Sequence, residues 1–432
     1  MVTLIDNLSL KIDNCILGGR QESHMEKKIL VQKFGGTSVG DVEKIKNVAR
    51  RVIAAKKKGY KVVVVVSAMG DHTDDLIELA KKITDNPPER EMDMLLSTGE
   101  QVSISLLAMA INKMGHKAIS FTGQQVGLVT DSVHCKAKIK SIGTDRILEH
   151  LNKNEIVIVA GFQGINQEAE ITTLGRGGSD ITAVALASVL KAKVCEIFTD
   201  VDGVYTSDPR IIPTARKLKV VSYDDMLELA SLGAKVLHPR SVEFAKKYNV
   251  DIHVRSTFVL DEGTIITGEV KEMEDVVISG VVLNKEEAKI KIVSVPDKLG
   301  IAAKIFKKLA DSNVNVDMIV QNVSDNGRTD ISFTVFKEDL KKALEVSKAL
   351  VKSIGAKEVI CSEDIAMVSV VGVGMRRHAG VAAKMFEALA NKNINIQMIS
   401  TSEIRISCVV NEKDGLAAAK AIHTKFGLDK KK

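Results

Sequence analysis

The C-terminal part of the chain contains an internal repeat that restricts its fold more than any other feature of the sequence. The stretch "LGIAAKIFKKLADSNVNVDMIVQNVS", which begins at Leu299, matches "AGVAAKMFEALANKNINIQMISTSEI", which begins at Ala379, at a constant offset of 80 residues. Each copy reads as a strand, a glycine, a helix, two strands and a second helix. Agreement over the whole unit indicates the duplication of one α+β module.

The two copies differ at their ends, and this difference predicts how they are connected. The first copy ends in a strand, "AKEVICS", whereas the second ends on the helix "GLAAAKAIHTKF". Without such a strand, one sheet edge would be left unpaired. The strand "DVVISGVVL" precedes the first copy and is available to fill that edge. We therefore expect the first module, residues 285–363, to be inserted within the second, which takes residues 276–284 and 364–428 of a regulatory region 276–432.

Residues 27–258 follow another pattern, in which short strands alternate with amphipathic helices. The strand candidates are rich in β-branched residues: "KKILVQ", "YKVVVVVSA", "KAISFTG", "EIVIVAGF", "CEIFTDV" and "VDIHVRS". The helix after Gly40 shows one apolar stripe at spacings of three and four, formed by Val42, Ile45, Val48, Ala49, Val52 and Ile53. Strands separated by helices imply an α/β fold, with a mainly parallel sheet between helix layers.

Two segments fall outside these domains. "LDEGTIITGEVKEMED" interrupts the alternation with glycine and charge, so we expect residues 259–275 to be a linker. Residues 1–26 are unlike the rest of the chain, and Met25 would be a sensible native start. We interpret residues 1–26 as an expression leader or a disordered segment, with a natural extension as the alternative.

Composition argues against several classes of partner. The net charge is +6, but half of it comes from the terminal "KKK", and aromatic residues make up only 3%. A nucleic-acid surface requires a basic stripe with aromatic residues. No apolar run approaches the length of a membrane span, because "VVVVV" fits a buried strand. Five scattered cysteines suit reduced thiols in a cytoplasm and argue against a metal site. We expect no nucleic-acid or membrane partner.

The segment "KFGGTS", from Lys33 to Ser38, ends a predicted strand and precedes a helix. Adjacent glycines let phosphate oxygens approach backbone N–H groups, and the helix N-terminus adds a partial positive charge. The lysine supplies a full charge. The Walker A pattern is absent. From these residues alone, a phosphate site and a structural turn both remain open.

A second glycine-rich turn, "TTLGRGGSD", opens another helix. Ser179 or Asp180 would suit a helix N-cap, but a cap does not require Arg176 and two glycines beside it. Since an arginine fork binds carboxylates in bidentate fashion, we expect a second anion site that faces the first. Glu100 lies near the start of a further helix, where favourable helix charging is the alternative interpretation.

The generic turn sequence "FTDVDGVYTSDPR" follows another strand, and Tyr205 and Arg210 in it are candidates to line a nucleotide site. Read together, seven segments resemble the aspartate kinases of the amino-acid-kinase superfamily, in order and in spacing: "KFGGTS", "VSAMGDHTDDL", "STGEQ", "VAGFQG", "TTLGRGGSD", "TDVDGVYTSDPR" and "GAKVLHPRS". The tandem modules resemble ACT domains, which bind amino acids in many biosynthetic enzymes. The resemblance extends from Lys27 to Leu428 and implies an amino-acid-kinase fold followed by two βαββαβ ACT modules.

This resemblance implies an activity. ATP, which carries Mg²⁺, would phosphorylate the β-carboxylate of L-aspartate to 4-phospho-L-aspartate, the first step towards lysine, threonine and methionine. Lys33, helped by the N–H groups of Gly35 and Gly36, would neutralise charge on the transferred phosphoryl group. Asp180 would orient Lys33 and help to hold Mg²⁺, with no separate metal site.

The resemblance also assigns the two ends of the amino acid. Arg176 would bind the α-carboxylate of aspartate and Glu100 its ammonium. The substrate site would further contain Thr73, Gly177, Gly178 and Ser179. The ATP site would consist of Lys33, Phe34, Gly35, Gly36, Ser38, Thr199, Asp200, Tyr205, Arg210 and Lys235.

For the regulatory region, the resemblance implies feedback inhibition by threonine, lysine or both. The effector site would be built at two glycine-containing strand-to-helix turns, for which a purely structural role is the alternative. Its residues would be Asp297, Gly300, Ala302, Asn315, Asp317, Gln321, Val381, Ala382, Asn395, Ile396 and Ser402. We also expect a homodimer through the ACT modules, or a complex with a shorter chain of the same gene that starts at Met273.

Two other functions remain open from the sequence. Another kinase of the superfamily would act on acetylglutamate, glutamate or UMP, although Glu100 with Arg176 favours a free amino acid. A non-catalytic amino-acid sensor could retain the fold, although intact Lys33, Arg176 and Asp180 argue against it. An ATP-dependent hydroxamate assay with aspartate separates these cases.

Overall fold

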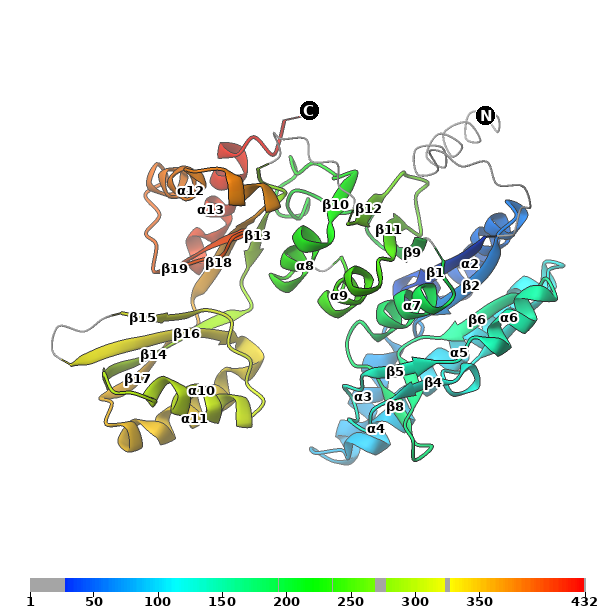
Figure 1. Cartoon of the computed structure of the whole chain (residues 1–432), viewed down its shortest axis with the longest axis horizontal. Helices are drawn as coiled ribbons and strands as arrows, with labels where there is room; N and C mark the ends of the chain where they lie inside the picture. Colours follow the sequence, from blue (N-terminus) through cyan, green and yellow to red (C-terminus); the bar gives the residue numbers. More distant parts are fainter. Residues whose placement is uncertain (1–27, 193, 235, 269–276, 323–326, 431–432) are drawn as a thin grey trace.

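The computed structural model describes residues 28–192, 194–234, 236–268, 277–322 and 327–430 (Figure 1). The predicted leader, the ATP-site candidate Lys235 and the candidate start Met273 lie outside the described residues.

An eight-stranded sheet forms the centre of the N-terminal domain, with the order β10-β12-β11-β9-β1-β2-β6-β3. Every adjacent pair is parallel except β11 with β12. The six strands expected from the sequence are all present, and the predicted α/β class is confirmed. The strands are β1 (Ile29–Phe34), β2 (Lys61–Val66), β3 (Ala118–Phe121), β6 (Ile156–Ala160), β9 (Val194–Thr199), β10 (Val220–Ser222), β11 (Asp251–Ser256) and β12 (Thr264–Thr267).

Helices cover both faces of this sheet, because nearly every residue of its central strands is apolar. In β2, Val62 and Val64 face α2 and α5, whereas Val63 and Val65 face the layer that contains α7. The helices are α2 (Val42–Lys57), α3 (His72–Ile83), α4 (Glu89–Leu96), α5 (Thr98–Lys113), α6 (Asp145–Asn152), α7 (Gly178–Val189), α8 (Tyr223–Ser231) and α9 (Pro239–Tyr248), with short 3₁₀ turns η1 (Gly36–Val39) and η2 (Gln124–Val126). The predicted stripe of α2 is buried except for Val42, which lies in the first turn and is 61% exposed.

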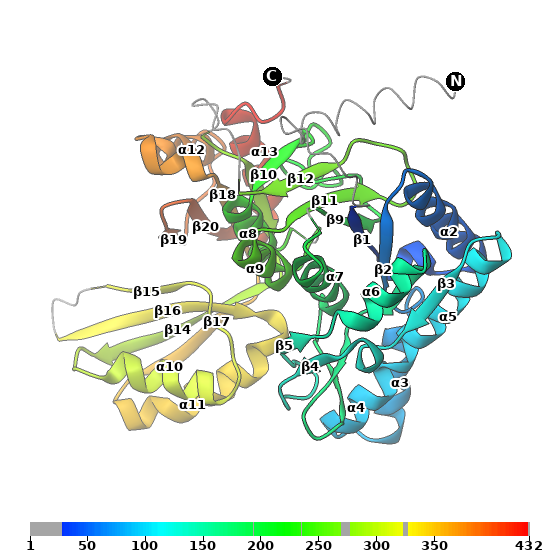
Figure 2. The ribbon, with the colours of Figure 1, turned by 45° about the vertical axis from the view of Figure 1, so that its right-hand side comes forward.

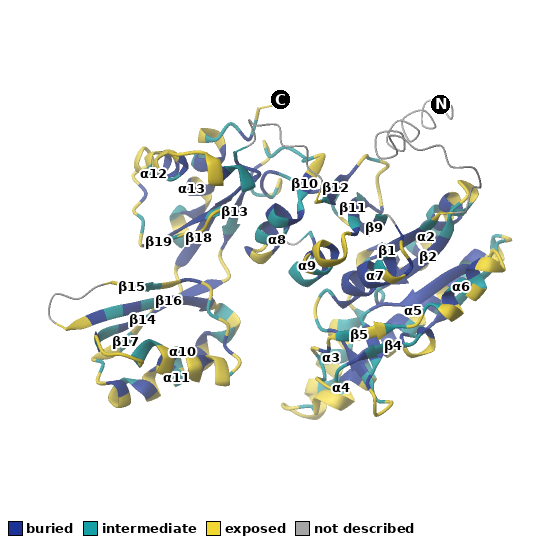
Figure 3. Ribbon diagram, viewed as in Figure 1, coloured by how far each residue is buried: buried dark blue, intermediate teal, exposed yellow. Residues whose placement is uncertain are grey.

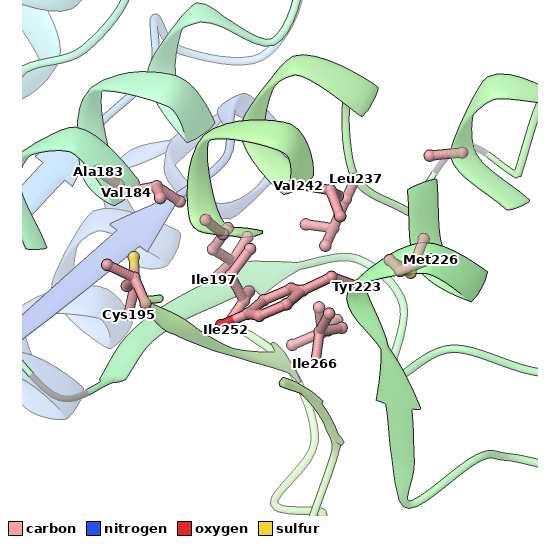
Figure 4. Close-up of a cluster of buried hydrophobic side chains, with 14 of the residues drawn as sticks. Ala183, Val184, Cys195, Ile197, Tyr223, Met226, Leu237, Val242, Ile252 and Ile266 are labelled. Atoms are coloured by element: carbon pink, nitrogen blue, oxygen red, sulfur yellow. The ribbon is translucent and has the colours of Figure 1, made fainter. Parts of the chain in front are cut away.

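The core between α7, α8, α9 and the sheet is continuous and apolar. Ile197 of β9 and Ile252 of β11 point into it, with Val184 of α7 and Val242 of α9 above them (Figure 4). This packing matters for function because it fixes the start of α7 and the start of α9 over the same strands.

A smaller sheet that the sequence did not predict packs beside the main one, with the order β5-β4-β7-β8. Its strands are β4 (Leu128–Thr130), β5 (Ile139–Ile142), β7 (Gln163–Ile165) and β8 (Ile171–Thr173). They have three or four residues each, too few to show a period in the sequence. β8 leads directly into the glycine-rich turn before α7.

One helical run in the described residues, Glu89–Lys113, is long and apolar enough to span a membrane by length and composition alone. Polar and charged residues, among them Asp93 and Glu100, interrupt this run. Half of its apolar window is buried inside the protein, and α5 packs on α2 and on β3 and β6. Because core helices of globular domains pass the same test, this run is weak support for a membrane segment.

Two four-stranded sheets form the C-terminal region, with the orders β15-β16-β14-β17 and β13-β18-β20-β19. The first module consists of β14 (Glu287–Pro296), α10 (Ile301–Asp311), β15 (Ile319–Gln321), β16 (Arg328–Phe336), η3 (Lys337–Asp339), α11 (Leu340–Ile354) and β17 (Glu358–Ser362). The second consists of β13 (Gly280–Asn284), β18 (Ile365–Val371), η4 (Val373–Arg377), α12 (Val381–Ala390), β19 (Met398–Thr401), β20 (Arg405–Asn411) and α13 (Glu412–Lys425). β13 pairs antiparallel with β18, so the strand that precedes the first module lies in the sheet of the second.

The second module is joined to the N-terminal domain by the loop after β9. Ile212 of this loop is 3% exposed and packs in the apolar core of the second module. The buried carboxylate of Asp225 in α8 accepts hydrogen bonds from Ser279 Oγ (2.7 Å) and from the backbone N–H of Val373 (2.9 Å). The two modules turn their sheets towards each other, and α10 and α12 lie on the outer sides (Figures 1 and 2).

Candidate active site

The predicted phosphate and substrate segments meet at one edge of the main sheet. The parallel strands β9, β1, β2 and β6 lie side by side, so their carboxyl ends share this edge. The segments that follow these strands contain Gly35, Ala68, Gly161 and Asp200. Open α/β sheets bind their ligands at this edge.

Lys33, near the end of β1, pairs with Asp180 in the first turn of α7. Lys33 Nζ lies 2.6 Å from Asp180 Oδ1, and each side chain is 11% exposed. The pair therefore holds the ammonium of Lys33 beside a helix N-terminus, whose free N–H groups also attract anions. This geometry suits a binding site for a phosphate group.

Glu100, in the first turn of α5, is the second ionisable group of this edge. It is 3% exposed, and its Oε1 accepts a hydrogen bond from the backbone N–H of Ala68 at 3.1 Å. Its Oε2 is buried and has no hydrogen-bond partner among the described residues. Burial raises the pKa of Glu100 to about 8, because desolvation penalises the charged form. A buried carboxylate with one unpaired oxygen is suited to bind a cationic group of a ligand.

Close backbone packing connects these segments. A Cβ atom on Gly36 would lie 2.9 Å from the carbonyl oxygens of both Ala68 and Gly70. A Cβ atom on Gly161 would lie 2.6 Å from Oγ of Ser179. Only glycine allows these approaches, so the ends of β1, β2 and β6 and the start of α7 converge on one small space.

Arg176 and Thr73 lie at the border of this space. Arg176 is exposed, in the turn between β8 and α7, and Thr73 is half-buried in the first turn of α3. Gly178, by contrast, is buried, and a Cβ atom there would lie 2.8 Å from the ring of Phe162. Phe162 itself has a positive φ of 69°, a strained conformation that is frequent at functional sites.

The predicted nucleotide residues divide into two groups. Thr199 and Asp200 lie at the end of β9, beside β1, and the Thr199 hydroxyl donates to Asp200 Oδ1 at 2.9 Å. Tyr205 and Arg210 lie further along the loop, where each already has a carboxylate partner. Tyr205 donates to Asp202 at 2.9 Å, and Arg210, 78% exposed, pairs with Asp208 at 2.7 Å.

Comparison with known proteins gives the family. The family model described as the amino acid kinase family matches residues 28–256, and the ACT domain model matches residues 290–349 and 368–426. An aspartate kinase of Pseudomonas putida is 54% identical over 402 residues, which cover 93% of this chain and 98% of the relative. The chain belongs to the aspartate kinase family.

Solved structures of this family agree with the fold. Aspartokinase III of E. coli in complex with aspartate and ADP is 25% identical, with a TM-score of 0.77, and covers 92% of this chain and 99% of its own. The same enzyme in complex with lysine and aspartate gives a TM-score of 0.73 at the same identity and coverage. The predicted kinase fold with tandem ACT modules, and the predicted aspartate kinase activity, are therefore confirmed.

Three residues predicted for the ATP site have partners inside the protein. Ser38 is fully buried, and its Oγ lies 2.6 Å from Oγ1 of Thr257. Phe34 is also fully buried and stacks on Phe198, with ring centroids 4.6 Å apart. The N–H of Gly35 donates to the carbonyl oxygen of Phe198 at 3.2 Å. These groups hold β1 against its neighbours, and the place of the three residues in the ATP site stays a prediction.

The predicted effector residues are divided between the two modules. Gly300 and Gly380 each cap a helix with positive φ, 85° and 88°. α10 and α12 lie on the outer sides of the two modules (Figure 1), so the two turns belong to separate modules. Most of the candidates are accessible, while Ala302, Ala382 and Ile396 are half-buried and Val381 is only 7% exposed. Asp317 already lies 3.7 Å from Arg405 of the second module.

Sequence reasoning missed two residues that contact the turn of Arg176. His238 caps α9, and Arg240 follows it in the first turn. Both lie in "GAKVLHPRS", a segment used only for the resemblance. Their contacts with the turn are long-range, so no local pattern indicated them.

Proposed function

We propose that the chain phosphorylates the β-carboxylate of L-aspartate with ATP at the edge that Lys33, Asp180 and Glu100 share, and that these residues have distinct roles. The observation that supports this most directly is the position of one cation and one buried carboxyl group. The ammonium of Lys33 is held at the N-terminus of α7, and the buried carboxylate of Glu100 has an oxygen without a partner among the described residues.

Lys33 would act on the phosphoryl group. Phosphoryl transfer requires positioning and neutralisation of charge rather than covalent chemistry by the protein. Asp180 holds the ammonium of Lys33 at 2.6 Å, so the charge is fixed before ATP binds. The aspartate β-carboxylate is ionised at neutral pH and needs no general base.

Glu100 and Arg176 would bind opposite ends of aspartate. Glu100 Oε2 would accept from the ammonium, and the exposed guanidinium of Arg176 would bind the α-carboxylate in bidentate fashion. Thr73, Ser179 and the backbone of Gly177 would complete this side. A free amino acid has both charges, whereas acetylglutamate and UMP lack the free ammonium.

ATP would bind across the ends of β1 and β9, with Gly36, Thr199 and Asp200 closest to the phosphates and Tyr205 further along the loop. Magnesium would be carried by ATP, where it neutralises charge on the phosphate oxygens. Asp180 would contribute one carboxylate oxygen, as Mg²⁺ sites in kinases require. The described residues contain no group of three or more His, Cys, Asp or Glu that would form a separate metal site.

Regulation would follow from binding of a pathway product, threonine or lysine, to the ACT turns. A related aspartokinase binds lysine together with aspartate, which supports lysine as an effector. Because the two turns of one chain lie on separate modules, a complete effector site would use a second chain, either a homodimer partner or a shorter product of the same gene. The enzyme would then serve the synthesis of lysine, threonine and methionine.

The test is product trapping. The purified chain with ATP, Mg²⁺, aspartate and hydroxylamine should form aspartyl hydroxamate, whereas glutamate, acetylglutamate and UMP should give little product. The Lys33→Ala variant is the control for a contaminating kinase. A wild-type chain without aspartate-dependent hydroxamate would contradict the proposal and leave an amino-acid sensor as the better explanation.

A further inference from the structure

Residues at the start of α9 contact the turn that contains Arg176 and hold it in place. The N–H of Gly178 donates to the carbonyl of Gly175 at 2.9 Å, which closes a four-residue turn with Arg176 in its second position. Gly177, in the third position, has φ 72°, the sign that a type II turn requires there. Arg176 is exposed, so the direction of its side chain depends on how firmly the backbone of the turn is held by its neighbours.

Two nitrogens of the Arg240 guanidinium hold the residues at which this turn begins. Its Nη1 donates to the carbonyl of Leu174 at 2.6 Å, and its Nη2 donates to the carbonyl of Ala137 at 3.1 Å. The N–H of Ala137 in turn donates to the carbonyl of Thr173 at 2.9 Å. The guanidinium therefore joins the last residues before the turn to a separate loop. A planar fork can reach two carbonyls at once, which a lysine ammonium cannot do with fixed geometry.

His238 holds the other side of the turn. A Cβ atom on Gly177 would lie 2.3 Å from both Cβ and Cγ of His238, so the imidazole packs directly on this glycine. Its Nδ1 accepts the N–H of Arg240 at 3.3 Å. Desolvation lowers the pKa of His238, so the ring is neutral at pH 7 and can act as this acceptor. The histidine thus caps α9 and packs on the turn at the same time.

We propose that Arg240, with His238, is a positioning residue for the substrate: it holds the turn 175–178 so that Arg176 is directed at the α-carboxylate of aspartate. This inference rests on the proposed role of Arg176. Both donating nitrogens of Arg240 are engaged by protein carbonyls, so its effect is exerted through Arg176 and not by contact with a ligand.

The test uses steady-state kinetics of the full chain with Arg240→Met and Arg240→Lys. Loss of charged hydrogen bonds that orient a binding group should raise KM for aspartate by about tenfold in Arg240→Met. KM for ATP should change less than about twofold, and Arg240→Lys should fall between wild type and Arg240→Met because it retains the positive charge but not the planar fork. His238→Asn keeps the helix cap but removes the ring from Gly177, and should also raise KM for aspartate alone.

A matched control is Arg146→Met. Arg146 also donates to a backbone carbonyl, that of Gln125 at 3.4 Å, but it lies near β3, at the far edge of the main sheet. This variant should leave both KM values unchanged. Thermal unfolding of all variants identifies general destabilisation. Should Arg240→Met fail to fold, Arg240→Lys and His238→Asn decide the question.

A double-mutant cycle separates this inference from the role of Arg176. If Arg240 acts through Arg176, then Arg240→Met should add less than about twofold to the KM for aspartate of Arg176→Ala. Full additivity, or an equal rise in both KM values, would overturn the inference alone. A normal KM for aspartate in Arg176→Ala would overturn the proposed carboxylate contact, and the positioning role with it.

Discussion

Thr206 Oγ1 and His423 Nε2 lie 2.9 Å apart, and both residues are fully buried. Thr206 directly follows Tyr205 in the loop after β9, and His423 lies in α13 of the second ACT module. The loop that leads from the nucleotide side of the kinase domain is therefore hydrogen-bonded to the last helix of the regulatory region (Figure 3 colours the chain by burial). This contact has a consequence for stability.

Stability should fall in mild acid because of His423. Desolvation lowers the pKa of His423 from the ordinary value of 6.5, with Asp429 opposing and Arg216 adding to this effect. The unfolded chain therefore binds a proton at a higher pH than the folded chain, so stability is lost as pH decreases through about 6.5. We expect a lower denaturant midpoint at pH 5.5 than at pH 7.5.

His423→Gln is the informative variant, since its amide can still donate to Thr206 but does not titrate. The difference between the two pH values should become smaller, though not zero, because burial also lowers the pKa of His253. An unchanged pH dependence in His423→Gln would show that this histidine does not titrate on unfolding.

Catalysis should depend on both members of the Lys33–Asp180 pair. Lys33→Met and Asp180→Asn should each lower kcat by about 10²-fold or more, the scale of one preorganised electrostatic group. Each single variant leaves one charge without its partner, with some loss of stability. The double variant removes both charges and should recover stability without recovering kcat. Near-normal kcat in Lys33→Met would refute the phosphoryl role.

Aspartate binding should improve as pH rises. Because burial raises the pKa of Glu100 to about 8, the free enzyme at pH 7 carries this carboxyl mostly protonated, and the substrate ammonium requires it ionised. KM for aspartate should therefore decrease between pH 6.5 and about 8.5, while KM for ATP changes little. Calorimetry in two buffers of different ionisation enthalpy should detect proton release on aspartate binding. Glu100→Gln should have a high KM for aspartate without this pH dependence.

Ser38 provides a test of which residues form the ATP site. Its hydroxyl is paired with Thr257 in the interior, so Ser38→Ala should leave KM for ATP unchanged. The lost buried hydrogen bond should lower the free energy of unfolding by about 1 kcal/mol. A rise in KM for ATP at normal stability would restore Ser38 to the nucleotide site.

The sequence predicted what is periodic or local and missed what depends on distant contacts. The apolar strands and the repeat have regular patterns, so the sheet of β1, β2, β3, β6, β9 and β11 and the module order followed from them. The motif containing Ser38 could not reveal that its hydroxyl faces Thr257, 219 positions away. Arg240 contacts carbonyls 66 and 103 positions away, and no spacing in the sequence records such pairs.

It should be possible to remove feedback inhibition without loss of catalysis, because the effector candidates lie on the ACT modules and not in the kinase domain. Asp297 is exposed beside the N-terminus of α10, and its backbone N–H donates to Gly327 at 2.8 Å. Gln321 is exposed on β15. Asp297→Ala and Gln321→Ala should make the enzyme insensitive to threonine and lysine while kcat and KM for aspartate stay near wild type. Asp311→Ala, an exposed change at the end of α10, is the matched control and should remain inhibitable.

Inhibition requires that the effector bind the inactive arrangement more tightly than the active one. A ~100-fold preference corresponds to roughly 2.7 kcal/mol, within the usual range of coupling free energies. Because the turns of α10 and α12 lie on separate modules of one chain, inhibition should also require association, and light scattering with and without effector should show a dimer or larger species. If the wild type were inhibited by neither amino acid, alone or together, or if it were inhibited as a monomer, this account of regulation would be wrong.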